Sequence, residues 1–175
     1  FDNEIIPILT KAGCNTGACH GASVGRGGFK LSLYGGDSEF DYRSIVLELE
    51  GRRVNLARPD ESLILLKATS SIAHGGGYRL EYDGTGAKLL LKWIQAGTRR
   101  TQQRRLDSFH VSPKLHVADR VGTSLQLKAT ARFTDGSTVD VTKWTVFTPE
   151  DTAAVQIDRA TSQGKQVPPG RPRLV

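Results

Sequence analysis

The only two cysteines of the chain lie close together near its start, and a histidine directly follows the second. They are Cys14, Cys19 and His20. Two thiols beside an imidazole are what covalent haem attachment needs, because the thiols add across the porphyrin vinyl groups and the imidazole becomes an axial ligand of the iron. The common C-x-x-C-H form has a shorter spacer than the four residues found here. The pattern therefore predicts one covalently attached haem, held by an unusual CX4CH motif.

Three other interpretations of these side chains stay open. A Cys14–Cys19 disulfide would close a short loop and suit an exported protein, but it gives the neighbouring histidine no role. A zinc ion would take the same three side chains and His74, although adjacent Cys19 and His20 are hard to direct at one tetrahedral ion. Free thiols in a cytosolic protein are the third alternative. The sequence favours haem over all three.

A haem iron at this motif needs a second axial ligand, and the chain has no methionine to supply one. His74 is the best candidate, because the three glycines at 75–77 let the backbone approach the macrocycle closely. Tyr34, Tyr78 and Lys30 are weaker candidates. Two histidine ligands, His20 and His74, would give a low-spin iron with a lower reduction potential than a histidine–methionine pair. Such a centre suits electron transfer.

Other side chains are expected around the haem. Residues 21–36 hold six glycines around Phe29, which is typical of a loop that wraps closely over a flat group. Phe29 is therefore a candidate haem contact. Arg79 and Arg26 are candidate partners of the haem propionates, because a guanidinium matches the geometry of a carboxylate.

Helices are expected on either side of the glycine-rich loop. Asn3 is a candidate cap for a first helix that ends just before Cys14. The run that starts at Pro59 begins a short helix, and the apolar spacing predicts a last helix over 86–96. Residues 1–98 are thus expected to form a mostly helical haem domain.

Composition and charge limit the number of domains and the kinds of partner that the chain can have. Its 175 residues, 38% of them hydrophobic and 24% charged, suit one large or two small folded domains. No apolar run is long enough to span a membrane, and no signal peptide is visible. Four arginines, at positions 99, 100, 104 and 105, lack interleaved aromatic residues. We therefore interpret residues 99–106 as a basic linker and expect no nucleic-acid binding.

Beyond the linker, the apolar periodicity changes from helical to alternating, as in the run from Leu125 to Phe133. Short strands of this kind, with a tight turn at Asp135 and Gly136, predict an antiparallel sandwich over 107–160. Residues 161–175 show little strand pattern and are expected to form an irregular tail.

No catalytic site is expected in this second half. His110 and His116 have no nucleophile nearby, so they are interpreted as structural or exposed histidines. Glu150 and Asp151 are only a weak calcium-binding pair, because no loop motif surrounds them. The domain is interpreted as a spacer or adhesion module.

The motifs of the first half resemble a known family. The helix running into Cys-x4-Cys-His-Gly and the last-helix sequence over 90–97 resemble class I cytochrome c domains. More narrowly, Gly27-Gly28-Phe29, the run at 59–62, and the His74 loop with Arg79 resemble the cytochrome c-like module of large planctomycete cell-envelope proteins. This resemblance covers residues 1 to about 100.

The second half resembles a bacterial immunoglobulin-like domain of the second group, through residues 121–127, 133–137 and 140–142. Together the resemblances imply a mostly α class I cytochrome c-like domain followed by an all-β immunoglobulin-like sandwich. Either the sandwich is cut short here or the tail folds differently from that family.

The function that these resemblances imply is electron transfer by a monohaem c-type module, not enzymatic catalysis. They also imply export to the periplasm or cell envelope, further domains in a longer polypeptide, and an unidentified redox protein as partner. A haem-based sensor of small ligands is the first alternative. A structural adhesion module with a Cys14–Cys19 disulfide and no haem is the second.

Overall fold

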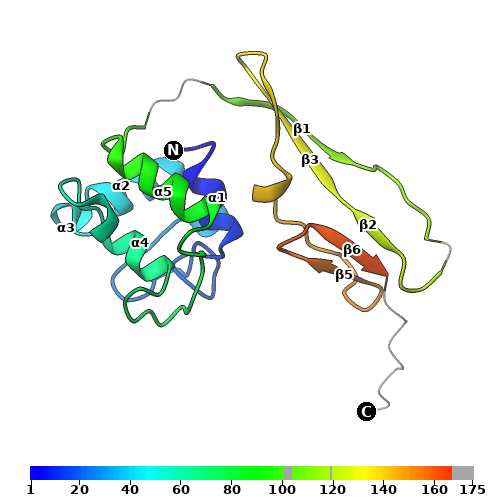
Figure 1. Ribbon diagram of the computed structural model, residues 1–175, viewed down its shortest axis with the longest axis horizontal. Helices are drawn as coiled ribbons and strands as arrows, with labels where there is room; N and C mark the ends of the chain where they lie inside the picture. The colour runs from blue at the N-terminus through cyan, green and yellow to red at the C-terminus, as the bar shows by residue number, and fades with distance from the viewer. Residues whose placement is uncertain (101–103, 119, 167–175) are drawn as a thin grey trace, which may run out of the picture. The chain divides into compact units, whose positions relative to one another are not determined.

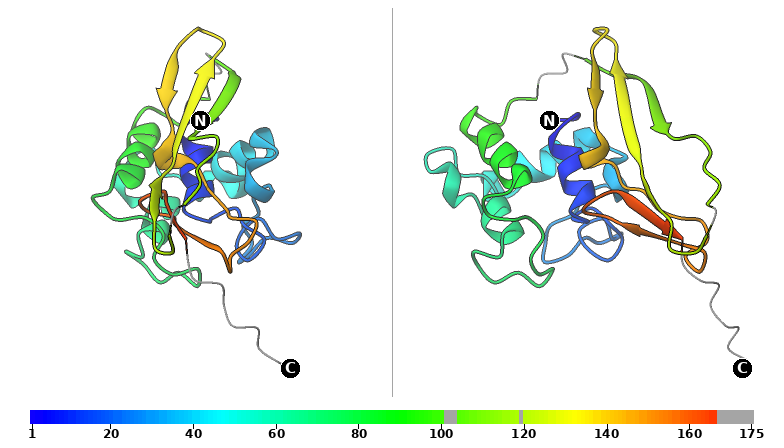
Figure 2. Two further views of the ribbon diagram at one scale, coloured as in Figure 1. Left: turned by 90° about the vertical axis from the view of Figure 1, so that its right-hand side faces the viewer. Right: turned by 45° about the vertical axis from the view of Figure 1, so that its right-hand side comes forward.

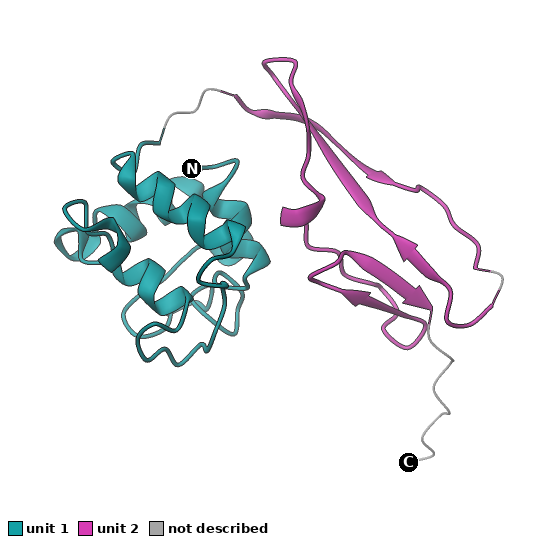
Figure 3. Ribbon diagram, in the orientation of Figure 1, with its two compact units in different colours: residues 1–103 teal, residues 104–175 magenta. Residues whose placement is uncertain are grey.

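The computed structural model describes residues 1–100, 104–118 and 120–166. The chain divides into two compact units, Phe1–Gln103 and Arg104–Val175 (Figure 3). The division falls inside the stretch 99–106 that was predicted as a linker, of which residues 101–103 lie outside the described residues. Residues 167–175 of the predicted tail lie outside them as well.

Unit 1 is built from short helices joined by long loops. They are α1 (Ile5–Lys11), α2 (Ser38–Val46), α3 (Glu48–Gly51), α4 (Leu63–Ala68) and α5 (Thr85–Gln95) (Figure 1). Its core consists of apolar side chains from α1 and α5, which lie side by side in Figures 1 and 2, together with Leu31 and Ile45. The ring of Phe1 packs 5.3 Å from that of Trp93, which joins the chain start to α5. This core fixes the end of α1, from which the cysteine loop departs.

The mostly α, class I cytochrome c-like fold predicted for residues 1–98 is wrong. Helix makes up only 28% of the chain, and the longest helix, α5, has 11 residues. Even α3 is no regular helix, because Leu49 and Glu50 have positive φ angles of 52° and 57°. The physical reason lies in the many glycines between the helices, which disfavour helix and allow tight turns.

Glycines also stop the first and last helices where the sequence predicts. Gly13 has a φ of 77° after α1, and Gly97 has a φ of 79° after α5, the left-handed conformation that ends many helices. The backbone N–H of Cys14 then donates to the carbonyl of Leu9 at 2.8 Å. The N-terminal caps differ from the prediction, since the cap of α1 is Glu4 and not Asn3.

The described residues of unit 2 form two three-stranded antiparallel sheets (Figure 1). The first has the order β1 (Leu106–Ser112), β3 (Lys128–Phe133), β4 (Thr138–Asp140). The second has the order β2 (Ser124–Gln126), β6 (Gln163–Gln166), β5 (Val155–Asp158). The predicted turn at Asp135 and Gly136 joins β3 to β4, and Asp135 Oδ1 accepts a hydrogen bond of 2.9 Å from the backbone of Ser137.

The immunoglobulin-like sandwich predicted for residues 107–160 is wrong. The continuous alternation from Leu125 to Phe133 breaks at Leu127, whose N–H donates to the carbonyl of Ser162 at 3.1 Å. As a result β2 and β3 belong to different sheets. Phe109 and Val111 of β1 lie opposite buried alanines of β3. Their own side chains nevertheless remain 46% and 37% exposed. A sandwich would bury these side chains between its two sheets.

The first residues of the predicted tail form a strand. β6 pairs with β2 on one side and β5 on the other. Its four residues, Gln163 to Gln166, carry no apolar side chain, so no alternation marked it in the sequence and backbone hydrogen bonds hold it. Within the described parts of both units, no helix is long and apolar enough to cross a membrane.

Candidate functional site

The loop that carries both cysteines is held rigidly at the end of α1. Its backbone closes on itself, because the N–H of His20 donates to the carbonyl of Cys14 at 2.9 Å. Asn15 is fully buried inside the loop, and its amide donates to Thr10 Oγ1 at 2.8 Å. A Cβ at Gly21 would lie 2.1 Å from the carbonyl oxygen of Asn15, so only glycine fits there. The loop geometry is therefore set by backbone contacts.

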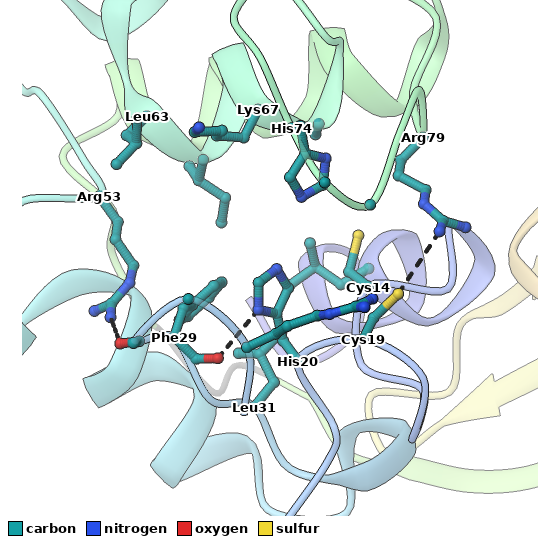
Figure 4. A pocket seen from close by; sticks show the side chains of 18 of the residues that line it. Cys14, Cys19, His20, Phe29, Leu31, Arg53, Leu63, Lys67, His74 and Arg79 are labelled. Atoms are coloured by element: carbon teal, nitrogen blue, oxygen red, sulfur yellow. Dashed lines mark hydrogen bonds between the residues drawn. The ribbon is translucent and has the colours of Figure 1, made fainter. Parts of the chain in front are cut away.

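All six side chains predicted for the site line one cavity of unit 1, which has a volume of about 460 Å³ (Figure 4). They are Cys14, Cys19, His20, Phe29, His74 and Arg79. Apolar side chains such as Leu9, Leu31 and Leu63 complete the walls. Cofactor pockets commonly measure about 300–1,000 Å³ and are mostly apolar with a few placed polar groups. The cavity fits that description.

The imidazole of His20 is fixed by the glycine-rich loop. Residues 26–29 form a tight two-residue turn in which Gly27 and Gly28 have φ angles of 61° and 71°. This turn directs the carbonyl of Phe29 at Nδ1 of His20, 3.1 Å away. A carbonyl only accepts hydrogen bonds, so Nδ1 carries the proton and Nε2 keeps its free electron pair. Burial, the largest cause, lowers the pKa of His20 and favours its neutral form.

His74 is held in the same way by a separate loop. Its Nδ1 lies 3.0 Å from the carbonyl of Gly77, so its Nε2 is also left without a proton. A Cβ at Gly76 would lie 2.7 Å from Cε1 of the ring, so a side chain at that position would push the imidazole aside. The loop returns to α4, because the backbone N–H groups of Arg79 and Leu80 both donate to Ala68 at 2.9 Å.

The two imidazoles face each other across the cavity. Their ring centroids lie 6.2 Å apart and their planes are 11° from parallel (Figure 4). This distance is too long for direct ring contact. A metal ion bonded to both Nε2 atoms at about 2 Å each would separate the ring centres by about 6 Å. The spacing and the two tautomers therefore fit a metal held between His20 and His74.

The two thiols are free and lie on the wall of the same cavity. Burial raises the pKa of the Cys14 thiol to about 11, with a smaller opposing effect from Arg79. Arg79 donates to Cys19 Sγ at 3.6 Å, so its guanidinium faces the thiols. Arg26 donates to the carbonyl of Ala18 at 3.0 Å. Both arginines line the cavity, where they were predicted to meet propionates.

The structure does not support the disulfide and zinc interpretations of the two cysteines. The structure contains no Cys14–Cys19 disulfide. Within residues 1–100, 104–118 and 120–166, no group of three or more His, Cys, Asp or Glu side chains could hold a metal ion, so a zinc site of protein ligands is not formed. Lys30, Tyr34 and Tyr78, the weaker candidates for the distal ligand, are not among the described residues that line the cavity.

Two residues of unit 2 that were considered as possible functional residues lie on a strand and in a turn, and their surroundings do not indicate a catalytic role. His110 is exposed on β1. Asp151 Oδ1 accepts a hydrogen bond of 2.8 Å from the backbone of Ala153, which makes it a turn residue. The arginines of the predicted linker are anchored in their own units, since Arg100 pairs with Asp2 and Glu39 while Arg104 donates to Ser137.

Arg53 is a buried, charged residue of the cavity that the sequence did not predict. Arg53 lines it with a side chain that is only 6% exposed, and it contacts the turn that holds His20. An arginine between charged and apolar neighbours gives no sequence signal for burial.

No protein-family model matches the chain, and no curated protein matches it either.

Proposed function

We propose that unit 1 is an electron-transfer module that carries one haem c, bonded through Cys14 and Cys19, with His20 and His74 as axial ligands. The observation that carries this proposal is the pair of imidazoles held 6.2 Å apart at their centroids, each with Nδ1 bound to a backbone carbonyl. Both free thiols on the wall of the same cavity support it.

The residues of the site have separate parts in this proposal. His20 and His74 would hold the iron through Nε2, because Nδ1 of each ring lies at hydrogen-bond distance from a backbone carbonyl. Cys14 and Cys19 supply the thiols that form thioethers. When bound, haem c supplies one-electron redox chemistry, at a potential that axial ligation can vary over about 0.8 V.

The charges around the cavity support an anionic cofactor. Five cationic side chains line it, and no aspartate or glutamate does so among the described residues. The cations are Arg26, Arg52, Arg53, Lys67 and Arg79. Haem carries two propionate groups, which guanidinium forks recognise well. Arg79 keeps its proposed role as a propionate partner, and Phe29 keeps its role as a cofactor contact.

Electron transfer is favoured over small-ligand sensing because His74 is firmly held. Its ring is bound by the carbonyl of Gly77, and its loop is tied to α4 by two backbone hydrogen bonds at Ala68. If haem were bound, His20 and His74 would both hold its iron, which suits electron transfer better than exchange with a small molecule. The proposed role is therefore that of an electron carrier rather than an enzyme.

The wider setting is also a proposal, supported by the motif resemblance. We place the protein in the periplasm or cell envelope, as one part of a longer polypeptide that exchanges electrons with an unidentified redox protein. Unit 2 is proposed to act as a spacer or adhesion module.

Spectroscopy of the purified chain tests the function. The chain is expressed in cells that attach haem to c-type proteins, and visible spectra are recorded in both redox states, with and without carbon monoxide. We expect a low-spin spectrum that carbon monoxide does not change, and carbon monoxide binding in His74→Ala but not in the control His110→Ala. A colourless folded product would refute the proposal, and rapid carbon monoxide binding by the parent would favour a sensor.

A further inference from the structure

Arg53 is a buried charge at the edge of the cavity. Its side chain is only 6% exposed, although it carries a permanent positive charge. Burying such a charge is costly unless partners compensate it. The contacts that Arg53 makes therefore indicate what it does in the fold.

The guanidinium of Arg53 makes two interactions with the tight turn at residues 26–29. Nη2 donates to the carbonyl of Gly28 at 2.8 Å. The centre of the guanidinium also lies 4.3 Å from the ring centroid of Phe29, within the range of a cation–π contact. Nη1 anchors the group to the end of α2 through the carbonyl of Ser44, with Glu48 as ionic partner. Figure 4 shows Arg53 and Phe29 beside each other on one side of the cavity.

The turn is also held by its own two backbone hydrogen bonds and by the bond from Arg26 to the carbonyl of Ala18, but its two central residues carry no side chain that could anchor it. Nothing lies within 4 Å of where a Cβ would project from Gly27 or Gly28, and two successive glycines have the largest conformational freedom of any residue pair. The carbonyl of Phe29 accepts from the backbone of Arg26 at 2.8 Å and from Nδ1 of His20. Fixing this turn therefore fixes the hydrogen bond that sets the tautomer of His20.

We infer that Arg53 is a positioning residue for His20. By clamping Gly28 and Phe29, it holds the Phe29 carbonyl at Nδ1 and keeps Nε2 of His20 bare and directed into the cavity. The consequence for metal binding rests on the proposed function. The effect on the His20 tautomer does not, because it is a property of the haem-free chain.

The first measurement uses the haem-free chain with isotopically labelled histidines. Nitrogen NMR at a pH above the ordinary imidazole range reports which ring nitrogen carries the proton. We expect a single tautomer of His20 in the parent and a mixture of both in Arg53→Gln. Arg52→Gln is the matched control, because Arg52 is the neighbouring arginine of the same cavity and is exposed. It is expected to leave the His20 tautomer unchanged.

Two further variants separate positioning from charge and from folding. Arg53→Lys keeps the charge but has no planar fork, so it is expected to behave like Arg53→Gln. Glu48→Gln removes the ionic partner that lies 3.3 Å from Nη1 of Arg53 and changes neither His20 nor the turn, so it is expected to shift the tautomer in the same direction by a smaller amount. It keeps the inference testable if Arg53→Gln does not fold.

The second measurement is titration of each haem-free variant with haemin. Partners of metal-binding histidines typically change affinity about 10–100-fold when they are removed. We expect a loss of that size in Arg53→Gln and little change in Arg43→Gln, which replaces an exposed arginine of α2 that is not among the described residues lining the cavity. If a folded Arg53→Gln keeps the parent tautomer, the inference is overturned. Parent behaviour in Arg53→Lys alone would assign the effect to charge and also overturn it. A parent chain that does not bind haemin would refute the proposed function, whereas the NMR result would still decide the role of Arg53.

Discussion

The imidazole planes of His20 and His74 lie 11° from parallel with their centroids 6.2 Å apart. His20 lies in the cysteine loop and its Nδ1 bonds to the Phe29 carbonyl of the glycine-rich turn, whereas Nδ1 of His74 bonds to the Gly77 carbonyl of its own loop. The backbone thus selects the same tautomer twice and leaves two bare Nε2 atoms for a shared ligand. The predictions below test this arrangement and the groups around it.

Gly76→Ala is predicted to displace His74. An added Cβ would lie 2.7 Å from Cε1 and 3.0 Å from Nε2 of the ring. Because the ring can swing away, the free energy of unfolding should change by less than about 0.5 kcal/mol. The haem-loaded variant should bind carbon monoxide where the parent does not. Gly75→Ala is the control, since nothing lies within 4 Å of its Cβ position; identical behaviour of the two variants would contradict this account.

The thiol of Cys14 is predicted to react slowly in the haem-free folded chain. Burial raises its pKa from 9.0 to about 11, which lowers the thiolate fraction near neutral pH about a hundredfold. Alkylation by iodoacetamide is measured in a Cys19→Ser background, folded and unfolded in guanidinium. The folded rate should be far lower and keep rising with pH up to about 11. Equal rates in the two states would show that folding does not desolvate the Cys14 thiol and would contradict the prediction.

Ionisation of Asp41 is predicted to lower the free energy of unfolding as the pH rises from acid to neutral. Its carboxylate is fully buried against Ser32, and burial raises its pKa above the ordinary value of 3.8. The folded state then holds the proton more tightly than the unfolded state, so ionisation costs folding free energy as pH rises through the folded pKa. Urea unfolding of the parent and of Asp41→Asn is compared over that range. The stability of the parent relative to the variant should fall with increasing pH, and a constant difference would contradict the prediction.

Arg100 is predicted to stabilise unit 1 by joining the first residues of the chain to α2. Its guanidinium pairs with Asp2 at 3.0 Å and with Glu39, and its side chain is only 17% exposed. Arg100→Gln should lower the free energy of unfolding by about 1–2 kcal/mol. Arg99→Gln changes the neighbouring exposed arginine and should stay within about 0.5 kcal/mol of the parent. Urea titration measures both, and an equal loss would assign the effect to net charge.

The structure brings together the side chains that the sequence singled out, although the fold class predicted for them was wrong. Residue chemistry alone singled out Cys14, Cys19, His20 and His74, and the structure brings all four to one cavity across more than fifty residues of chain. The bond from His20 to a carbonyl and the burial of Arg53 could not be predicted, because both depend on the path of a glycine-rich turn that no periodicity specifies.

The fold class failed for a related reason. Apolar spacing located α5 within a residue of its bounds, predicted over 86–96 and found at Thr85–Gln95. It did not show how much of unit 1 would be loop. In unit 2, the alternation runs unbroken through Leu127, where the chain leaves one sheet for the other. That break depends on pairing with β6, a polar strand almost forty residues away.

The most direct test of the account is the mass of the denatured polypeptide purified from cells that attach haem to c-type proteins. We predict the mass of the chain plus one haem for the parent, and the mass of the bare chain for a variant with Cys14→Ser and Cys19→Ser. A parent chain of unmodified mass, folded and produced in cells that mature a known c-type protein, would contradict the central claim.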